Sequence, residues 1–278
     1  MIKISHLTYT YPSTSSPALV DLNLEIPAGQ FCGVVGPNRS GKSTLCYVLT
    51  GFAHHFFHGE LRGEVRVAGL DVASTPLGEL VASAGLVLDN PFNQITGARF
   101  TVREEVAFGL ENLGIPRGEM SERIDQALDQ VGISDLADRS PMALSGGEQQ
   151  RLAIASIVAM QPKLIVLDEP TAQLDPSGSR HVLDVLASMT VDHGTTIFLV
   201  EHKLEWLAQH ADRVILLRQG SIEDDGPPSQ VLAPKDAAGI GVQHTRYSLA
   251  ARKAVESGLV TGDKVIPVTL EQAVDFFQ

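Results

Sequence analysis

Residues 36–44 have the spacing of a phosphate-binding loop, and they read Gly-Pro-Asn-Arg-Ser-Gly-Lys-Ser-Thr. In such a loop the backbone N–H groups cradle phosphate oxygens at a helix N-terminus, where the helix dipole also favours negative charge. Lys42 is expected to reach the β- and γ-phosphates, and the Ser43 hydroxyl is expected to ligate Mg²⁺. The pattern arises by chance about once in a hundred chains of this size. The alternative interpretation is therefore an ordinary glycine-rich turn that binds no phosphate. The residues predicted to bind nucleotide here are Gly36, Asn38, Arg39, Ser40, Gly41, Lys42, Ser43 and Thr44.

A second element with phosphate chemistry is the segment 164–170, Leu-Ile-Val-Leu-Asp-Glu-Pro. An apolar strand that ends on two adjacent carboxylates delivers them to one edge of a sheet, on opposite faces of the chain. Asp168 can therefore hold the Mg²⁺ that Ser43 also holds, while Glu169 is free to polarise a water molecule as a general base. The motif is weak alone and specific in combination with the upstream phosphate loop.

A third element is the segment 144–151, Leu-Ser-Gly-Gly-Glu-Gln-Gln-Arg, called the signature segment below. It reads as a helix start in which Ser145 caps the helix and Glu148 reaches back to it. Gly146 and Gly147 leave the backbone N–H groups uncovered, which makes a second anion site. A single molecule has no obvious use for two such different anion sites unless the second one serves a neighbour's nucleotide.

The composition limits the classes of protein to which the chain can belong. It has 278 residues, of which 44% are hydrophobic and 19% charged, as in an ordinary folded protein. A net charge of −12 argues against a nucleic-acid partner, which would need a basic surface. No apolar run approaches the 18 or more residues of a membrane span, and the first residues do not resemble a signal peptide. We therefore expect a soluble, cytoplasmic protein whose role at a membrane would depend on a partner.

The pattern along the chain predicts an open α/β sheet with its site at the carboxyl edge of the strands. Antiparallel strands are expected within residues 2–7 and 19–26, followed by a strand at 30–35 and a helix at 43–50. Helices are expected at 101–112 and 121–131. The remaining expected strands are 63–69, 84–88, 163–167, 195–200 and 213–217. Residues 226–278 differ in composition and are predicted to form a small appendage, with helices at 249–257 and after a second capping box at 269–272.

These three motifs together resemble the nucleotide-binding subunit of ABC transporters, and the resemblance covers residues 1 to about 225. It implies an α/β P-loop NTPase core with a mixed sheet, an antiparallel N-terminal β part and a helical subdomain at about 90–160. Residues 226–278 would then be a C-terminal α/β extension, with dimerisation as its candidate role. The implied activity is ATP hydrolysis, with Mg²⁺ as cofactor, coupled to transport.

The resemblance also implies roles for individual residues. In that family two subunits dimerise head to tail, and each ATP lies between one subunit's phosphate loop and the other's signature segment. Tyr11 would stack on adenine, and the signature residues Ser145 to Glu148 would face the partner's ATP, with Ser145 and Gly147 at its γ-phosphate. Asp175 would lie in the loop 173–175 that crosses the dimer interface, and His202 would orient the γ-phosphate and the attacking water. Lys42, Glu169 and His202 are the expected catalytic residues.

The tail is similar to the C-terminal extension of energy-coupling-factor ATPases. The segments that carry this similarity are Gly-Ile-Gly-Val at 239–242, Leu-Ala-Ala-Arg at 249–252 and 268–274, together with 90–94 and 201–205. Such ATPases drive vitamin or cobalt/nickel uptake from the cytoplasmic face of the cell membrane. The implied partners are a second ATPase subunit, a transmembrane coupling subunit and a substrate-capturing membrane subunit.

Two positions depart from the family pattern. Arg39 stands where glycine is usual, and its side chain either contacts phosphate or points into solvent. Asp89 stands where the family has a glutamine that contacts Mg²⁺ and couples to the membrane subunit. Asp89 would then be a metal or water ligand, a partner for an arginine of the membrane subunit, or a tolerated change in one half of a heterodimer, with Gln94 as a distant substitute. These departures keep open the alternative of a nucleotide-binding half that hydrolyses little ATP. A soluble ABC protein without a transport role is a further alternative that does not depend on them.

Overall fold

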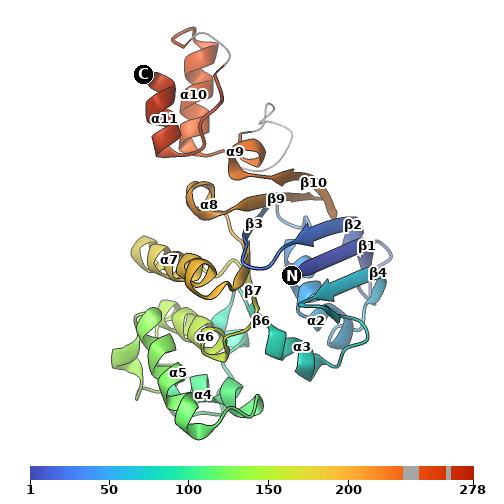
Figure 1. Ribbon diagram of the computed structural model, residues 1–278, viewed down its shortest axis with the longest axis vertical. Coiled ribbons are helices and arrows are strands. Elements are labelled where there is room, and N and C mark those ends of the chain that lie inside the picture. The colour runs from blue at the N-terminus through green and yellow to red at the C-terminus, as the bar shows by residue number, and fades with distance from the viewer. Residues whose placement is uncertain (234–243, 261–263) are drawn as a thin grey trace.

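The computed structural model describes residues 1–233, 244–260 and 264–278, and the expected Gly-Ile-Gly-Val segment at 239–242 lies outside them. The chain forms two sheets with helices packed on both faces of the larger one (Figure 1). Within the described residues, no helix has both the length and the apolar character needed to cross a membrane.

The smaller sheet is antiparallel and has the strand order β2-β1-β4-β5. Its strands are β1 (Ile2–Thr10), β2 (Leu19–Ile26), β4 (Glu60–Val67) and β5 (Leu70–Asp71). Along β1, buried Ile2 and Ile4 alternate with more exposed residues, which is the pattern of a sheet with one face on the core. The antiparallel N-terminal part predicted from the sequence is therefore confirmed, as a sheet of its own.

The larger sheet has the order β10-β9-β3-β8-β7-β6. All neighbouring strands are parallel except β9 and β10, which makes this sheet mixed. Every residue of β3, β7 and β8 is buried, as expected for parallel strands covered on both faces. The strands are β3 (Phe31–Val35), β6 (Ala84–Val87), β7 (Leu164–Asp168), β8 (Thr196–Val200), β9 (Arg213–Arg218) and β10 (Ser221–Gly226).

The larger sheet separates two hydrophobic cores. Successive residues of β3 alternate between them, with Phe31 and Val35 in one core and Cys32 and Val34 in the other. One core lies towards the antiparallel sheet and includes α1 (Lys42–Leu49), α2 (Phe52–His55) and α3 (Leu77–Ser83). The other lies towards α4 (Val102–Asn112), α5 (Arg117–Gln130), α6 (Gly146–Met160), α7 (Pro176–His193) and α8 (Leu204–His210).

Helices α4, α5 and α6 gather at one end of the molecule, within the region 90–160 expected to be helical (Figure 1). Thr101 and Glu104 form the predicted capping box at the start of α4. Three short 3₁₀ helices also lie here, at Pro91–Asn93, Ser134–Leu136 and Pro141–Ala143.

The described residues beyond 226 contain the helices α9 (Pro228–Val231), α10 (Arg246–Glu256) and α11 (Leu270–Phe277), with irregular segments between them. Helices α10 and α11 project from the end of the molecule opposite α4 and α5 (Figure 1). The described part of 227–278 contains no strand, and Pro267 there lacks the backbone donor that a strand ladder would use. The α/β character expected for the whole segment stays a prediction. Only one of the two hydrogen bonds of the second capping box is present. The Thr269 hydroxyl accepts the N–H of Gln272, but the Gln272 side chain accepts the N–H of Val268 and not that of Thr269.

Candidate nucleotide site

The phosphate loop connects β3 to α1 at the carboxyl edge of the larger sheet. Lys42 is buried, and its ammonium donates to the carbonyl oxygens of Gly36 at 2.9 Å and Pro37 at 3.0 Å. Burial lowers the pKa of Lys42, whereas the carboxylates of Glu169 and Asp168 act to raise it. The structure therefore places a cation against the loop's own backbone, beside the two carboxylates predicted from the sequence.

Two glycines are required by the shape of this loop. A Cβ at Gly36 would lie 2.1 Å from the Leu217 carbonyl oxygen, and one at Gly41 would lie 2.9 Å from the Ala18 carbonyl oxygen. Gly41 also has a φ of +105° and caps α1 without any side chain. The first N–H groups of α1 thus have no side-chain cap, as an anion-binding helix start requires.

Arg39 lies at the exposed tip of the loop with a φ of +64°. This left-handed conformation costs a non-glycine residue about 1–2 kcal/mol. Glycine avoids that cost but loses about 0.5–1 kcal/mol more backbone entropy on folding.

We expect Arg39→Gly to raise the Tm by no more than about 4 °C, because the two effects on the free energy of unfolding partly cancel. If the Arg39 side chain points into solvent, the KM for ATP should stay within about twofold of the wild type. Thermal unfolding and ATP hydrolysis of both proteins check this expectation. A clear rise in KM would instead show that the guanidinium contacts phosphate.

Asp168 and Ser43 lie together at the end of β7, as the sequence predicted. The Ser43 hydroxyl hydrogen-bonds the Asp168 carboxylate, which is only 4% exposed. Burial raises the pKa of Asp168, and this hydrogen bond opposes the effect. A buried carboxylate beside a hydroxyl offers the hard oxygen ligands that Mg²⁺ prefers.

Asp168→Asn should make the nucleotide-free protein more stable at neutral pH. Because the folded state raises the pKa of Asp168, it binds that proton more tightly than the unfolded state, and stability is lost as pH rises through the folded pKa. The amide has no such loss, so the Tm of the variant should exceed that of the wild type by a margin that shrinks towards acid pH. Melting curves in chelator from about pH 4 to pH 8 measure the margin, and a margin independent of pH would contradict this account.

Glu169 and His202 meet across the ends of two neighbouring strands. The Glu169 carboxylate lies 2.7 Å from the His202 ring nitrogen Nε2. The Glu169 backbone has a φ of +50°, and its N–H donates to the Val200 carbonyl oxygen at 3.0 Å. This kink ends the strand, and the two adjacent acids have different partners, His202 for Glu169 and Ser43 for Asp168, so they can take different roles.

Asp89 follows β6 at the same edge and is exposed. Its carboxylate accepts the N–H of Asn90 at 2.8 Å. Burial raises the pKa of Tyr47, on α1, to about 12, and the nearby negative charges of Asp168 and Asp89 add to that shift. Asp89 and Asp168 therefore lie near the same tyrosine, a neighbour that the sequence reading did not identify.

Gln94 is held by two hydrogen bonds at the edge of the sheet, and its role as a distant substitute for position 89 stays a prediction. Its side chain accepts the N–H of Leu88 at 3.1 Å and donates to the carbonyl oxygen of Ala153 at 3.2 Å. Both ends of the amide are used to join the edge of the sheet to α6. The buried Gln150, also missed from sequence, makes a parallel link by donating to the Leu88 carbonyl oxygen at 3.2 Å.

Tyr11 lies beside the phosphate loop. Its hydroxyl is 3.2 Å from that of Thr44, and its ring meets the rings of Tyr9 and Phe57 edge-on, at centroid distances of 5.0 and 5.8 Å. The neighbouring aromatic side chains fix the orientation of this half-buried ring. Stacking of Tyr11 on adenine stays a prediction.

The signature segment forms the expected capping box at the start of α6. The Ser145 N–H and hydroxyl both donate to the Glu148 carboxylate at 2.7 Å, and these bonds lower the pKa of Glu148. Within the chain the segment is next to the loop 173–175, since a Cβ at Gly147 would lie 3.3 Å from the Gln173 carbonyl oxygen. Asp175 caps the following helix α7 by accepting the N–H of Gly178 at 2.6 Å.

The signature segment and the phosphate loop are separate within one chain. Across the described residues, no side-chain hydrogen bond or ion pair joins 145–148 to the phosphate loop. Ser145 and Gly146 are exposed, as surfaces that meet a second molecule would be.

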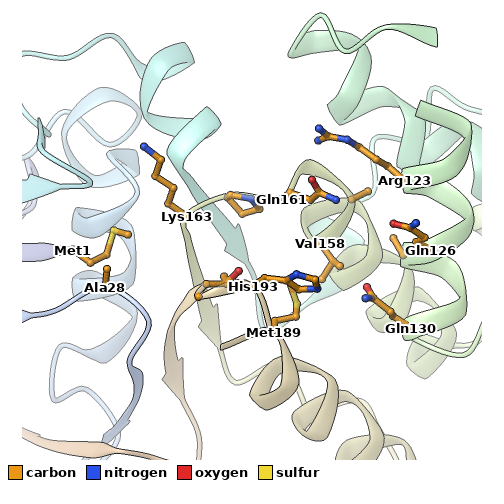
Figure 2. A pocket seen from close by; sticks show the side chains of 15 residues that line it. Met1, Ala28, Arg123, Gln126, Gln130, Val158, Gln161, Lys163, Met189 and His193 are labelled. Atoms are coloured by element: carbon orange, nitrogen blue, oxygen red, sulfur yellow. The ribbon is translucent and has the colours of Figure 1, made fainter. Parts of the chain in front are cut away.

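A cavity of about 500 Å³ lies away from this site, at the opposite ends of the strands. Figure 2 shows that its lining includes Arg123 from α5, Lys163 before β7 and His193 at the end of α7. None of the residues predicted from the sequence to bind nucleotide lines it. The candidate nucleotide site is therefore identified by the residues that meet at the phosphate loop, Lys42, Asp168 and Glu169, and not by cavity volume.

Comparison with known proteins gives a consistent result. Residues 19–172 match the family model described as ABC transporter. The chain is 42% identical over 233 residues to the energy-coupling factor transporter ATP-binding protein EcfA1 of Lacticaseibacillus paracasei, covering 84% of this chain and 81% of the relative.

Solved structures are similar as well. CbiO1 from Clostridium perfringens, described as part of the ABC transporter complex CbiONQ, superposes with a TM-score of 0.73 at 30% identity, covering 91% of this chain and 93% of its own. An ATP-binding cassette solved as a dimer in a post-hydrolysis state with ADP and phosphate superposes with a TM-score of 0.71 at 26% identity, covering 82% and 99%.

Proposed function

The chain belongs to the ABC transporter family, as an ATPase that powers a transporter, and from this premise we propose that it serves an uptake system of the energy-coupling-factor type. The observation that carries the proposal is the similarity to EcfA1 and CbiO1, the second of which extends beyond the catalytic core into the C-terminal part. The transported substrate would be a vitamin or a metal ion, captured by a separate membrane subunit. The chain would act at the cytoplasmic face of the membrane, bound to a transmembrane coupling subunit.

The geometry of the site supports a division of labour in hydrolysis. Ser43 and Asp168 would hold Mg²⁺, which neutralises phosphate charge when bound. The buried Lys42 ammonium would leave its two carbonyl partners for phosphate oxygens. Glu169 would take the proton of the attacking water, and His202, 2.7 Å away, would orient Glu169 and the water.

We propose that hydrolysis occurs in a head-to-tail dimer. Within one chain the signature segment and the phosphate loop are separate, and a second copy or a related subunit would bring Ser145 and Gly147 to the ATP held by Lys42. A helix start with uncovered N–H groups suits the γ-phosphate. Asp175 would lie in the interface between the two subunits.

Steady-state hydrolysis of ATP with Mg²⁺, measured over a range of protein concentrations, tests this proposal. We expect turnover to rise more than linearly with concentration, since active sites form only in the dimer. Linear dependence from the lowest concentrations would contradict a reversible homodimer. Turnover that appears only after a related ATPase or the membrane subunit is added would favour a heterodimer in which this chain is one half.

Asp89 is proposed to be a ligand of the metal or of its water. We expect Asp89→Ala to raise the Mg²⁺ concentration needed for half-maximal hydrolysis several-fold, because a carboxylate near Asp168 is lost. Asp89→Gln, which restores the side chain usual in the family, is the matched variant and should retain the wild-type value. If neither substitution changes hydrolysis or transport, Asp89 has no such role.

A further inference from the structure

A buried polar network lies behind His202. It consists of Glu201, Thr171 and Ser179, which are 4%, 3% and 2% exposed, and the half-buried Lys203. Burying a charge costs folding free energy unless the charge is paired and hydrogen-bonded. The hydrogen-bond partners of each group therefore show which parts of the chain the network connects.

Glu201 shapes the backbone that carries His202. One of its carboxylate oxygens accepts the N–H of His202 at 2.8 Å and that of Lys203 at 3.2 Å. The other oxygen accepts the hydroxyl of Thr171 at 2.6 Å. The turn after β8 is thereby folded around a single buried carboxylate.

Lys203 closes the network from the opposite side. Its ammonium donates to the hydroxyl oxygens of Thr171 at 2.7 Å and Ser179 at 2.6 Å. The Thr171 hydroxyl donates to Glu201 and accepts from Lys203, so one hydroxyl joins the two opposite charges. Burial lowers the pKa of Lys203, while Glu201 acts to raise it.

The two hydroxyls belong to segments that follow other predicted site residues, Glu169 and Asp175. Thr171 lies two residues after Glu169. Ser179 lies in the first turn of α7, which begins at the cap Asp175. Lys203 therefore connects the turn that carries His202 both to the strand end that carries Glu169 and to the loop 173–175.

We propose that Lys203 is a positioning residue for ATP hydrolysis: through Thr171 and Ser179 it holds His202 within hydrogen-bond distance of Glu169. This inference rests on the proposed hydrolytic function. The His202 side chain is itself exposed, with Glu169 as its one side-chain partner among the described residues, so its placement depends on the turn beneath it. Small displacements of a positioned group can cost up to about 10²-fold in rate.

The test compares Lys203→Met in two backgrounds. In the wild type we expect kcat to fall about tenfold and the KM for ATP to change by less than about twofold, because the phosphate loop is untouched. In a His202→Ala background the same substitution should lower kcat by less than about twofold, because the imidazole that Lys203 positions is already absent. Equal losses in the two backgrounds, or no loss in the wild type, would overturn the proposal.

Thr171 offers a matched pair that separates positioning from general stability. Thr171→Ser keeps the hydroxyl and should retain kcat, whereas Thr171→Val keeps the shape and should lose it about tenfold. Lys253→Met, on an exposed face of α10, serves as the control for loss of a lysine. If all network variants keep the wild-type turnover, the role of Lys203 is refuted but the proposed function is not. If no assembly that contains the wild-type chain hydrolyses ATP, the proposed function itself is refuted.

Discussion

Glu169→Gln should lower the kcat for ATP hydrolysis by about 10²–10⁴ while leaving ATP binding intact. The amide cannot accept the proton of the attacking water, but it keeps the length and the hydrogen bond by which Glu169 meets His202. Lys42 and the phosphate loop are unchanged, so the substrate should bind with nearly the same affinity. The variant should therefore accumulate in the ATP-bound state.

Two measurements check this expectation. Single-turnover hydrolysis gives the loss in the chemical step, and gel filtration with and without ATP shows whether the bound variant accumulates as a dimer. Glu271→Gln, at an exposed position on α11, is the control for a change of charge. Near-normal turnover of Glu169→Gln would remove Glu169 as the base and would require another acceptor near the phosphates.

The sequence predicted the parts of the fold that follow from local patterns. Alternating residues in β1 and β2 and mostly apolar runs in β7 and β8 indicated the correct strand types, because burial on one face or on two leaves different sequence patterns. The capping box at Thr101 fixed the start of α4. The 18-residue helix α7 was not predicted, although Asp175, Pro176 and Gly194 stand at its ends as helix boundaries often do.

The site was predictable where one short segment carries it. The phosphate loop and the pair Asp168 and Glu169 are motifs whose spacing already implies their geometry. The network of Lys203 was not predictable, since Thr171, Ser179 and Lys203 come from three elements and meet only after the sheet forms. The hydrogen bond from Gln94 to Ala153 was not predictable either, because the two residues are 59 positions apart in the sequence.

A mixture of two inactive variants should regain part of the activity, and this is the sharpest test of a site shared between two subunits. Lys42→Ala removes the phosphate-loop cation, and Gly147→Asp places a negative charge where the partner's γ-phosphate would lie. Each variant alone should lose nearly all turnover. Gly147→Asp should still fold, because an acidic residue is favourable in the first turn of a helix. The new Cβ would lie 3.3 Å from the Gln173 carbonyl oxygen, which is a tight contact, so the loop 173–175 must shift slightly to accept it.

The size of the recovery follows from the geometry of the dimer. In a head-to-tail dimer of the two variants, one site combines both defects and the other combines an intact phosphate loop with an intact signature segment. If half of the dimers in an equal mixture are mixed and sites act independently, the mixture should reach about one quarter of wild-type turnover. If the signature segment served the nucleotide of its own chain, no pairing could rescue either variant and the mixture would stay inactive. Because both outcomes come from the same two proteins, each shown to be folded by its melting curve, the comparison decides where the signature segment acts.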